Sequence, residues 1–242
     1  MHALRMNLRL GQRLFADDAR ERTAKLLDNF QPALVSRLMN YEIVDGARRS
    51  ITGFPAVQFV SLPDGFSLLG FGDLGRDILL DSTDSLAHAW SRELGRHVGL
   101  DSQSIACVIE PRAYALRYTV PRFVVQKRPE HREWAGDPVR GRALFEGLFI
   151  RSIQRQCEYL GIEMPEGMTA QFVGTEGEFG ARNGAGRPAC LGLRGAVFDV
   201  NAKLSGIWSV GRLLSKGYGH FVAHQQLGGT FADGEGGHAL SE

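Results

Sequence analysis

The sequence lacks three features that would each define a class of protein. It has 242 residues but no long apolar run, because stretches such as RFVVQK are broken by charge, and so no membrane span of about 20 residues is expected. The first segment, MHALRMNLRLGQRLF, has no contiguous apolar signal core, which favours a cytoplasmic location. The three cysteines, Cys107, Cys157 and Cys190, form no Cys-x-x-Cys pair, which argues against a zinc site and a disulfide framework.

A strong excess of charge is also missing. The net charge is +1 and the pI about 7.8, well short of the basic balance typical of nucleic-acid binders. The distribution is uneven, however, since residues 112–155 hold ten Lys or Arg against four acids and residues 201–221 hold three against none. This segregation fits a basic surface for a polyanion, and it fits a solvated charged face equally well.

The predicted elements follow the same order in both halves of the chain, which is strand, helix, strand, strand, helix, strand. In the first half the strands are residues 2–10, 56–62, 66–72 and 104–111, and the helices are residues 17–39 and 84–100. In the second half the strands are residues 114–126, 169–174, 189–204 and 219–224, the helices are residues 137–160 and 205–215, and residues 174–188 form a glycine-rich loop.

This repeated order predicts an α+β protein with two tandem ferredoxin-like (βαββαβ, RRM-like) domains. The first domain is expected over residues 1–111 and the second over residues 112–226. The polar, glycine-rich residues 227–242 are expected to form a flexible tail.

The segment SVGRLLSKGYGHF, residues 209–221, carries Gly211, Gly217 and Gly219 in a G-x5-G-Y-G pattern. It lacks the G-K-[ST] ending of a P-loop and precedes a strand instead of opening a helix, so ATP and NAD are disfavoured and no cofactor is predicted. Glycines at this spacing let backbone N–H groups approach a phosphate closely. The alternative is a capped helix end followed by a turn.

Four side chains in the same segment could add to the binding of a phosphate-containing ligand: Arg212, Lys216, Tyr218 and His220. The first two would add positive charge, and the other two could stack on a base or form hydrogen bonds.

Two ferredoxin-like repeats with this glycine-rich loop before the final strand resemble the RAMP superfamily of CRISPR-associated proteins, in particular its repeat-processing endoribonucleases. The phrases YTVPRFVVQK and LSGIWSVGRLLSKGYGHF are most similar to the divergent type IV branch, and the resemblance spans residues 1–225. It implies binding of the hairpin repeat of precursor CRISPR RNA and metal-independent attack of a ribose 2′-hydroxyl on the adjacent phosphate. It also implies retention of the product, other CRISPR effector subunits as partners, and no membrane.

Much of that family uses a histidine in or after the first helix, and this sequence has none between His2 and His88. The region holds four basic residues instead: Arg20, Arg22, Lys25 and Arg37. A guanidinium is a poor general base, yet it can clamp a phosphorane and orient the attacking hydroxyl.

Arg22 and Arg37 are the predicted catalytic residues, because they lie on the two helical pieces either side of a proline and could converge. Arg20 is the next choice, followed by Lys25. The alternative for each is an exposed helix charge in a local pair, such as Glu21 with Lys25 at i, i+4.

Other basic residues are predicted to bind RNA phosphates. They are His88, Arg92 and Arg96 on one helix face, Arg122, Lys127 and Arg128 along or just beyond a strand, and Arg151 and Arg155 one turn apart on the longest helix. Arginines can bridge the phosphates of the deep, narrow major groove of an RNA stem, although solvated faces explain the pattern equally well. Phe54 and Trp134 are candidate stacking platforms for an unpaired base, or else buried core aromatics.

Two other functions stay open at this point. A non-catalytic RAMP subunit that binds guide RNA would share the fold, the loop and the basic faces without transition-state groups. A base-stacking RRM-type module is disfavoured, because the K/R-G-F/Y-G/A-F-V-x-F/Y element is missing from the sequence.

Overall fold

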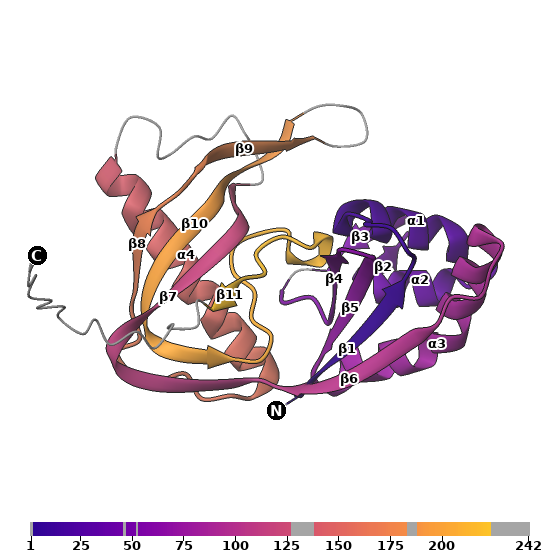
Figure 1. Cartoon of the computed structure of the whole chain (residues 1–242), viewed down its shortest axis with the longest axis horizontal. Coiled ribbons are helices and arrows are strands. Elements are labelled where there is room, and N and C mark those ends of the chain that lie inside the picture. The colour runs from indigo at the N-terminus through magenta and orange to yellow at the C-terminus, as the bar shows by residue number, and fades with distance from the viewer. Residues whose placement is uncertain (1, 46, 52, 127–137, 183–187, 224–242) are drawn as a thin grey trace, which may run out of the picture.

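The computed structural model describes residues 2–45, 47–51, 53–126, 138–182 and 188–223, and it contains two antiparallel sheets with helices packed on them (Figure 1). The N-terminal half lies toward one end of the longest axis and the C-terminal half toward the other. A loop from the second half extends to the first, where its short helix η1 packs on β4 and α1.

The first sheet has four strands and two helices against it. The strands are β1 (His2–Arg9), β4 (Val57–Leu62), β5 (Gly65–Phe71) and β6 (Leu100–Ala106), and the helices are α1 (Ala16–Asp28) and α3 (Gly72–Leu94). Alternation along β1 buries Leu4, Met6 and Leu8, and these residues join Phe66 and Trp90 in one core.

The second sheet is built in a similar way, but it has an additional strand, β9 (Gly177–Arg182), and a single α-helix packs against it in the described part of the chain. Its strands are β7 (Val108–Gln126), β8 (Ala170–Gly174), β10 (Pro188–Ser205) and β11 (Val222–Ala223), with β9 also paired to β10 and helix α4 (Pro138–Leu160) against one face. The rings of Phe149 on α4 and Phe198 on β10 lie 4.7 Å apart between their centroids.

The strand orders confirm the predicted fold class. The first sheet runs β4-β5-β1-β6 and the second runs β11-β7-β10-β8. We number the four strands of each order along the chain and leave β9 aside, because it lies off this path. Both sheets then read 2-3-1-4 from one edge, and all of these pairs are antiparallel. Both halves are therefore ferredoxin-like.

The helical restart expected at the proline is present, but the hairpin between it and β4 was not predicted. Helix α2 (Pro32–Leu38) is followed by a hairpin of β2 (Tyr41–Val44) and β3 (Ala47–Ser50). The hairpin is closed at its base by two hydrogen bonds. The N–H of Ile51 donates to the carbonyl of Asn40 at 3.0 Å, and the side-chain amide of Asn40 donates to the carbonyl of Ile51 at 3.3 Å.

Three local predictions are wrong. Helix α3 begins at Gly72, twelve residues before the expected start at 84. The expected glycine-rich loop contains β9. Residues 205–215 do not form an α-helix, since Gly206 and Gly211 have φ of 94° and 96°, outside the range of a right-handed helix, and only the 3-10 helix η1 (Leu214–Lys216) follows.

The first sheet ends at Ala106 and the second begins at Val108. The domain division at residues 111 and 112 stays a prediction, and the tail at 227–242 lies outside the described residues. In the part of the chain that the structure describes, none of the helices is long and apolar enough to cross a membrane.

Candidate nucleic-acid interface

A pocket of about 600 Å³ opens where the two halves of the chain meet. Its walls come from α1, the segment between α2 and β4, α4, and the loop that leads into η1. Four of its lining residues are cationic: Arg20, Arg155, Arg212 and Lys216. The described residues that line it include no carboxylate. A concave surface of this charge concentrates positive potential and is suited to an anion.

Arg155, Arg212 and Lys216 are the exposed cations of this junction pocket. Arg155 follows the exposed Arg151 by one turn of α4. The Nε of Arg212 donates to the carbonyl of Val125 at 2.9 Å, which orients its guanidinium. The structure thus brings Arg155 of α4 together with Arg212 and Lys216 of the glycine-rich segment, which the sequence predicted as RNA contacts on two separate elements.

Arg20 forms a buried part of the same pocket and is only 9% exposed. Its Nη2 donates to the carbonyl of Met39 at 2.7 Å, and its Nη1 donates to the hydroxyl of Tyr41 at 3.3 Å. The guanidinium also lies 5.1 Å from the centre of the Tyr41 ring. These contacts tie α1 to the base of the β2–β3 hairpin, so Arg20 already has a structural role in the absence of RNA.

The three glycines of the motif have positive φ, at 96° for Gly211, 81° for Gly217 and 80° for Gly219. A Cβ at Gly217 would overlap Ala16 Cβ and lie 2.6 Å from the Phe59 carbonyl oxygen. A Cβ at Gly219 would overlap the carbonyl oxygen of Val210. Backbone conformation and packing therefore explain these glycines. Their contact with phosphate stays a prediction.

Tyr218 and His220 are both engaged within the fold, Tyr218 as a buried and His220 as a half-buried residue. Tyr218 is 3% exposed, its ring is stacked on Phe179 with 6.1 Å between centroids, and the guanidinium of Arg122 lies 4.5 Å above it. His220 Nδ1 is 3.0 Å from the hydroxyl of Ser209, and burial lowers the pKa of His220 to about 4. The Tyr218 ring packs inside the fold and His220 is half-buried, and contact of these two residues with RNA stays a prediction.

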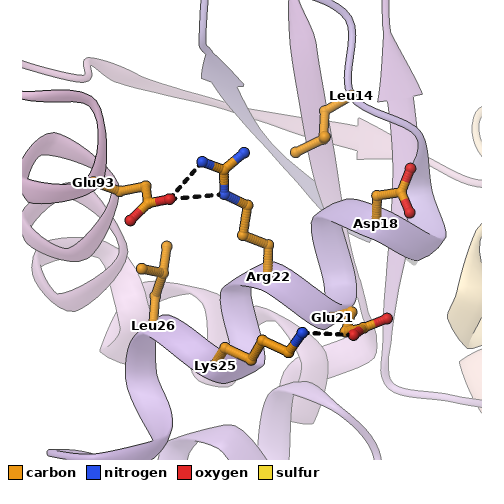
Figure 2. Close-up of a pocket in the computed structure, with 7 residues that line it drawn as sticks. All are labelled: Leu14, Asp18, Glu21, Arg22, Lys25, Leu26 and Glu93. Atoms are coloured by element: carbon orange, nitrogen blue, oxygen red, sulfur yellow. Dashed lines mark hydrogen bonds and ion pairs between the residues drawn. The ribbon is translucent and has the colours of Figure 1, made fainter. Parts of the chain in front are cut away.

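Arg22 lines a second pocket, of about 620 Å³, in which acids outnumber bases (Figure 2). Its Nε donates to Glu93 of α3 at 3.0 Å, and its Nη2 is paired with the same carboxylate oxygen. Lys25 is paired with Glu21 at 2.8 Å, and this lysine lowers the pKa of Glu21. For Lys25 the local pair expected as the alternative is thus present.

Arg37 is paired with Asp81 of α3 at 3.0 Å. Asp81 and Glu93 are twelve residues apart on α3, which corresponds to about 18 Å along the helix axis. Arg22 and Arg37 are therefore held at different places on α3, and the expected convergence is absent. Their catalytic role stays a prediction.

The basic stripe expected on α3 is shortened. The helix ends at Leu94, so Arg96 lies beyond it, and the Arg96 guanidinium donates to the carbonyl of Leu10 at 2.5 Å. His88 and Arg92 remain exposed on the helix. Lys127, Arg128 and Trp134 lie outside the described residues. Among the residues that are described, no three His, Cys, Asp or Glu side chains gather closely enough to hold a metal ion.

Sequence reasoning missed Tyr41 and Ile51, which line the junction pocket from the two ends of the hairpin. A signal for them existed, because Asp45 and Gly46 form an Asp-Gly pair flanked by apolar residues, a strong indicator of a two-residue hairpin turn. Asp45 has the positive φ, 52°, that such a turn requires.

Comparison with known proteins places this geometry in a family. The family model described as the type IV CRISPR-associated endonuclease Csf5 matches residues 1–226. The chain belongs to the Csf5 family. As the resemblance implied, it is a divergent member of the Cas6-like, type IV CRISPR-associated proteins. No curated protein gives a significant match.

Solved structures show the same fold. A Csf5 described as a type IV Cas6 crRNA endonuclease has 19% identity and a TM-score of 0.66, with 93% of this chain and 99% of that chain covered. A Cas6b described as a CRISPR RNA processing endoribonuclease has 17% identity and a TM-score of 0.60, and a second Cas6b has 16% and 0.64. Each Cas6b comparison covers 93% of this chain and 100% of the other.

Proposed function

We propose that this Csf5-family protein cleaves precursor CRISPR RNA in its repeat hairpin without a metal ion and keeps the product bound. The observation that carries the proposal is the junction pocket, whose cations come from both halves of the chain and whose described lining has no carboxylate. RNA is a polyanion, and its scissile phosphate gains further negative charge in the transition state. Arg155, Arg212 and Lys216 would bind the RNA backbone there.

The proposed step is a transesterification. The ribose 2′-oxygen forms a bond to the adjacent phosphorus, and the bond from that phosphorus to the 5′-oxygen of the next nucleotide breaks. The 2′-hydroxyl loses one proton and the leaving oxygen gains one. Arginine and lysine stay protonated at neutral pH, so they stabilise charge while water exchanges the protons. The products are a 2′,3′-cyclic phosphate and a 5′-hydroxyl.

Arg22 and Arg37 remain our proposed transition-state residues, although each is held by a carboxylate in the structure. Both ion pairs are well exposed, with the two arginine side chains 41% and 45% accessible. Exposed pairs of this kind contribute only about 0–1 kcal/mol, so a bound phosphate can replace the carboxylate at little cost. We propose that RNA binding makes this exchange and brings toward the scissile phosphate the two guanidiniums, which the structure holds apart on α3.

The experiment is incubation of the purified protein with labelled repeat RNA in EDTA. Defined cleavage that leaves a 5′-hydroxyl is expected, and a single 2′-deoxy substitution at the cut site should abolish it. Loss of cleavage in EDTA would contradict metal independence. Cleavage that survives the 2′-deoxy substitution would contradict attack by the 2′-hydroxyl.

A non-catalytic subunit that binds guide RNA is the second candidate. The observation that favours it is the pairing of Arg22 with Glu93 and of Arg37 with Asp81, which leaves both arginines engaged within the protein. Tight binding of repeat RNA without any cleavage would support this function over the first.

A further inference from the structure

The junction pocket has an apolar wall as well as its cations. Ile51 is 46% exposed there although it is a large aliphatic residue, and Phe54 and Leu213 also line the pocket. Phosphate binding needs only the cations and gives no reason for this wall. The volume of about 600 Å³ is within the range of pockets that hold a small organic ligand.

The apolar wall is held in place by the surrounding structure. Phe54 packs edge-on against Phe71, with 5.0 Å between ring centroids, and its ring lies 5.2 Å from that of Tyr159. The backbone of Ile51 is held at the base of the hairpin, because its N–H donates to the Asn40 carbonyl and its carbonyl accepts from the Asn40 side-chain amide. The Phe54 ring and the Ile51 backbone are therefore held in place before a ligand binds, which lowers the cost of binding.

The two kinds of surface together match one nucleotide. A nucleobase has an apolar face that packs on aromatic and aliphatic side chains, and its phosphate carries the negative charge that Arg155, Arg212 and Lys216 complement. An apolar side chain of a partner protein would match the wall but would leave the cations without an anion. A base within an RNA duplex is stacked on its neighbours, so the base that enters must be unpaired.

We propose that the junction pocket binds one unpaired nucleotide of the repeat RNA, with its base against Ile51 and Phe54 and its phosphate on the cations. This inference rests on the proposed function and adds a specificity element to it. The pocket would select RNA that has a single-stranded nucleotide beside its stem, and Ile51 would be a specificity-determining residue.

The test is a scan of repeat RNA in which each nucleotide in turn is made abasic, with 2′-deoxy substitution at the cut site so that affinity is measured without cleavage. With the wild-type protein, one unpaired position should lose affinity by about 5- to 100-fold, the size of one stacking contact. With Ile51→Ser, making that position abasic should lower the RNA affinity only a few-fold, because the variant lacks part of the apolar surface on which the base packs.

Leu80→Ala is the matched control, since Leu80 is 48% exposed on α3 and is not among the residues that line the pocket. This variant should keep the full abasic effect. Phe54→Leu is a second variant, checked by thermal unfolding because Phe54 packs on the core.

The possible results separate this inference from the proposed function. If the wild-type protein cleaves repeat RNA but no abasic position responds to Ile51→Ser, the nucleotide pocket is wrong and another molecule covers the wall. An equal abasic effect in Ile51→Ser and wild type leads to the same conclusion. If the wild-type protein neither binds nor cleaves the RNA, the proposed function itself fails.

Discussion

Replacing Gly219 by alanine should destabilise the protein far more than the same change at Gly95. Both glycines have positive φ, 80° and 63°, and a residue with a Cβ in this region costs about 1–2 kcal/mol. At Gly95 nothing lies within 4 Å of an added Cβ, whereas at Gly219 the Cβ would overlap the Val210 carbonyl oxygen and lie 2.9 Å from Leu214 Cδ2. Overpacking of this kind adds about 1–3 kcal/mol.

The expected costs are therefore about 1–2 kcal/mol for Gly95→Ala and about 2–5 kcal/mol for Gly219→Ala. Urea unfolding, followed by tryptophan fluorescence, measures the free energy of unfolding of each variant. The comparison is valid if this free energy depends on urea concentration with the same slope in the wild-type protein and in both variants. Equal costs at the two sites would refute the packing explanation. Gly219 could then be assigned to RNA contact, which a loss of affinity in a folded variant would show.

Three further predictions concern charge. If the protein contacts about five RNA phosphates, a plot of the logarithm of the RNA-binding constant against the logarithm of salt concentration should have a slope of about −3 to −5. Replacing Arg155, Arg212 and Lys216 together by alanine should reduce the magnitude of this slope by about 2. His220 binds a proton more readily in the unfolded chain, where its pKa is 6.5, than in the fold, where burial lowers it to about 4. Stability should therefore fall by up to about 3 kcal/mol as pH decreases from 6.5 to 4, and a His220→Gln variant with the same pH dependence would contradict this. Arg22→Ala and Arg37→Ala should each slow cleavage about 100-fold with little change in affinity, while Glu93→Gln, which frees Arg22, should preserve cleavage; wild-type rates in both alanine variants would remove these arginines from the chemistry.

The regular parts of the fold could be predicted from the sequence, and the irregular parts could not. Alternation in residues 2–10 identified β1 because a half-buried strand has a period of two. Residues 205–215 were misread as a helix, because Ile207, Val210 and Leu214 stand at the i, i+3, i+7 spacing of a helix face. In the structure Ile207 and Val210 instead belong to a core cluster that also holds Ala3 and Leu69 of the first half. A short window of sequence does not contain such contacts.

The same limit applies to the candidate site. Arg212 and Lys216 could be predicted together as candidate RNA contacts because they lie within one glycine-rich loop. The engagement of Arg22 could not be recognised, because its partner Glu93 is 71 residues away along the chain and becomes a neighbour only when α1 and α3 pack together. Basic residues can be counted from a sequence, but whether each one is neutralised depends on tertiary packing.

The loop after β10 positions Arg212 and Lys216 in the junction pocket, because it is hydrogen-bonded to both halves of the chain. The buried hydroxyl of Ser209 donates to the side-chain oxygen of Gln58 on β4 at 2.9 Å, and the Ser209 N–H donates to Gln156 on α4 at 3.1 Å. The amide of Gln156 in turn donates to the carbonyl of Ile207 at 2.7 Å. Buried hydrogen bonds of this kind are costly to leave unmade, so they fix the loop where the two ferredoxin-like halves meet. Neither half contains the pocket alone, and a change that separates them would therefore disperse its cations even if every arginine and lysine were kept.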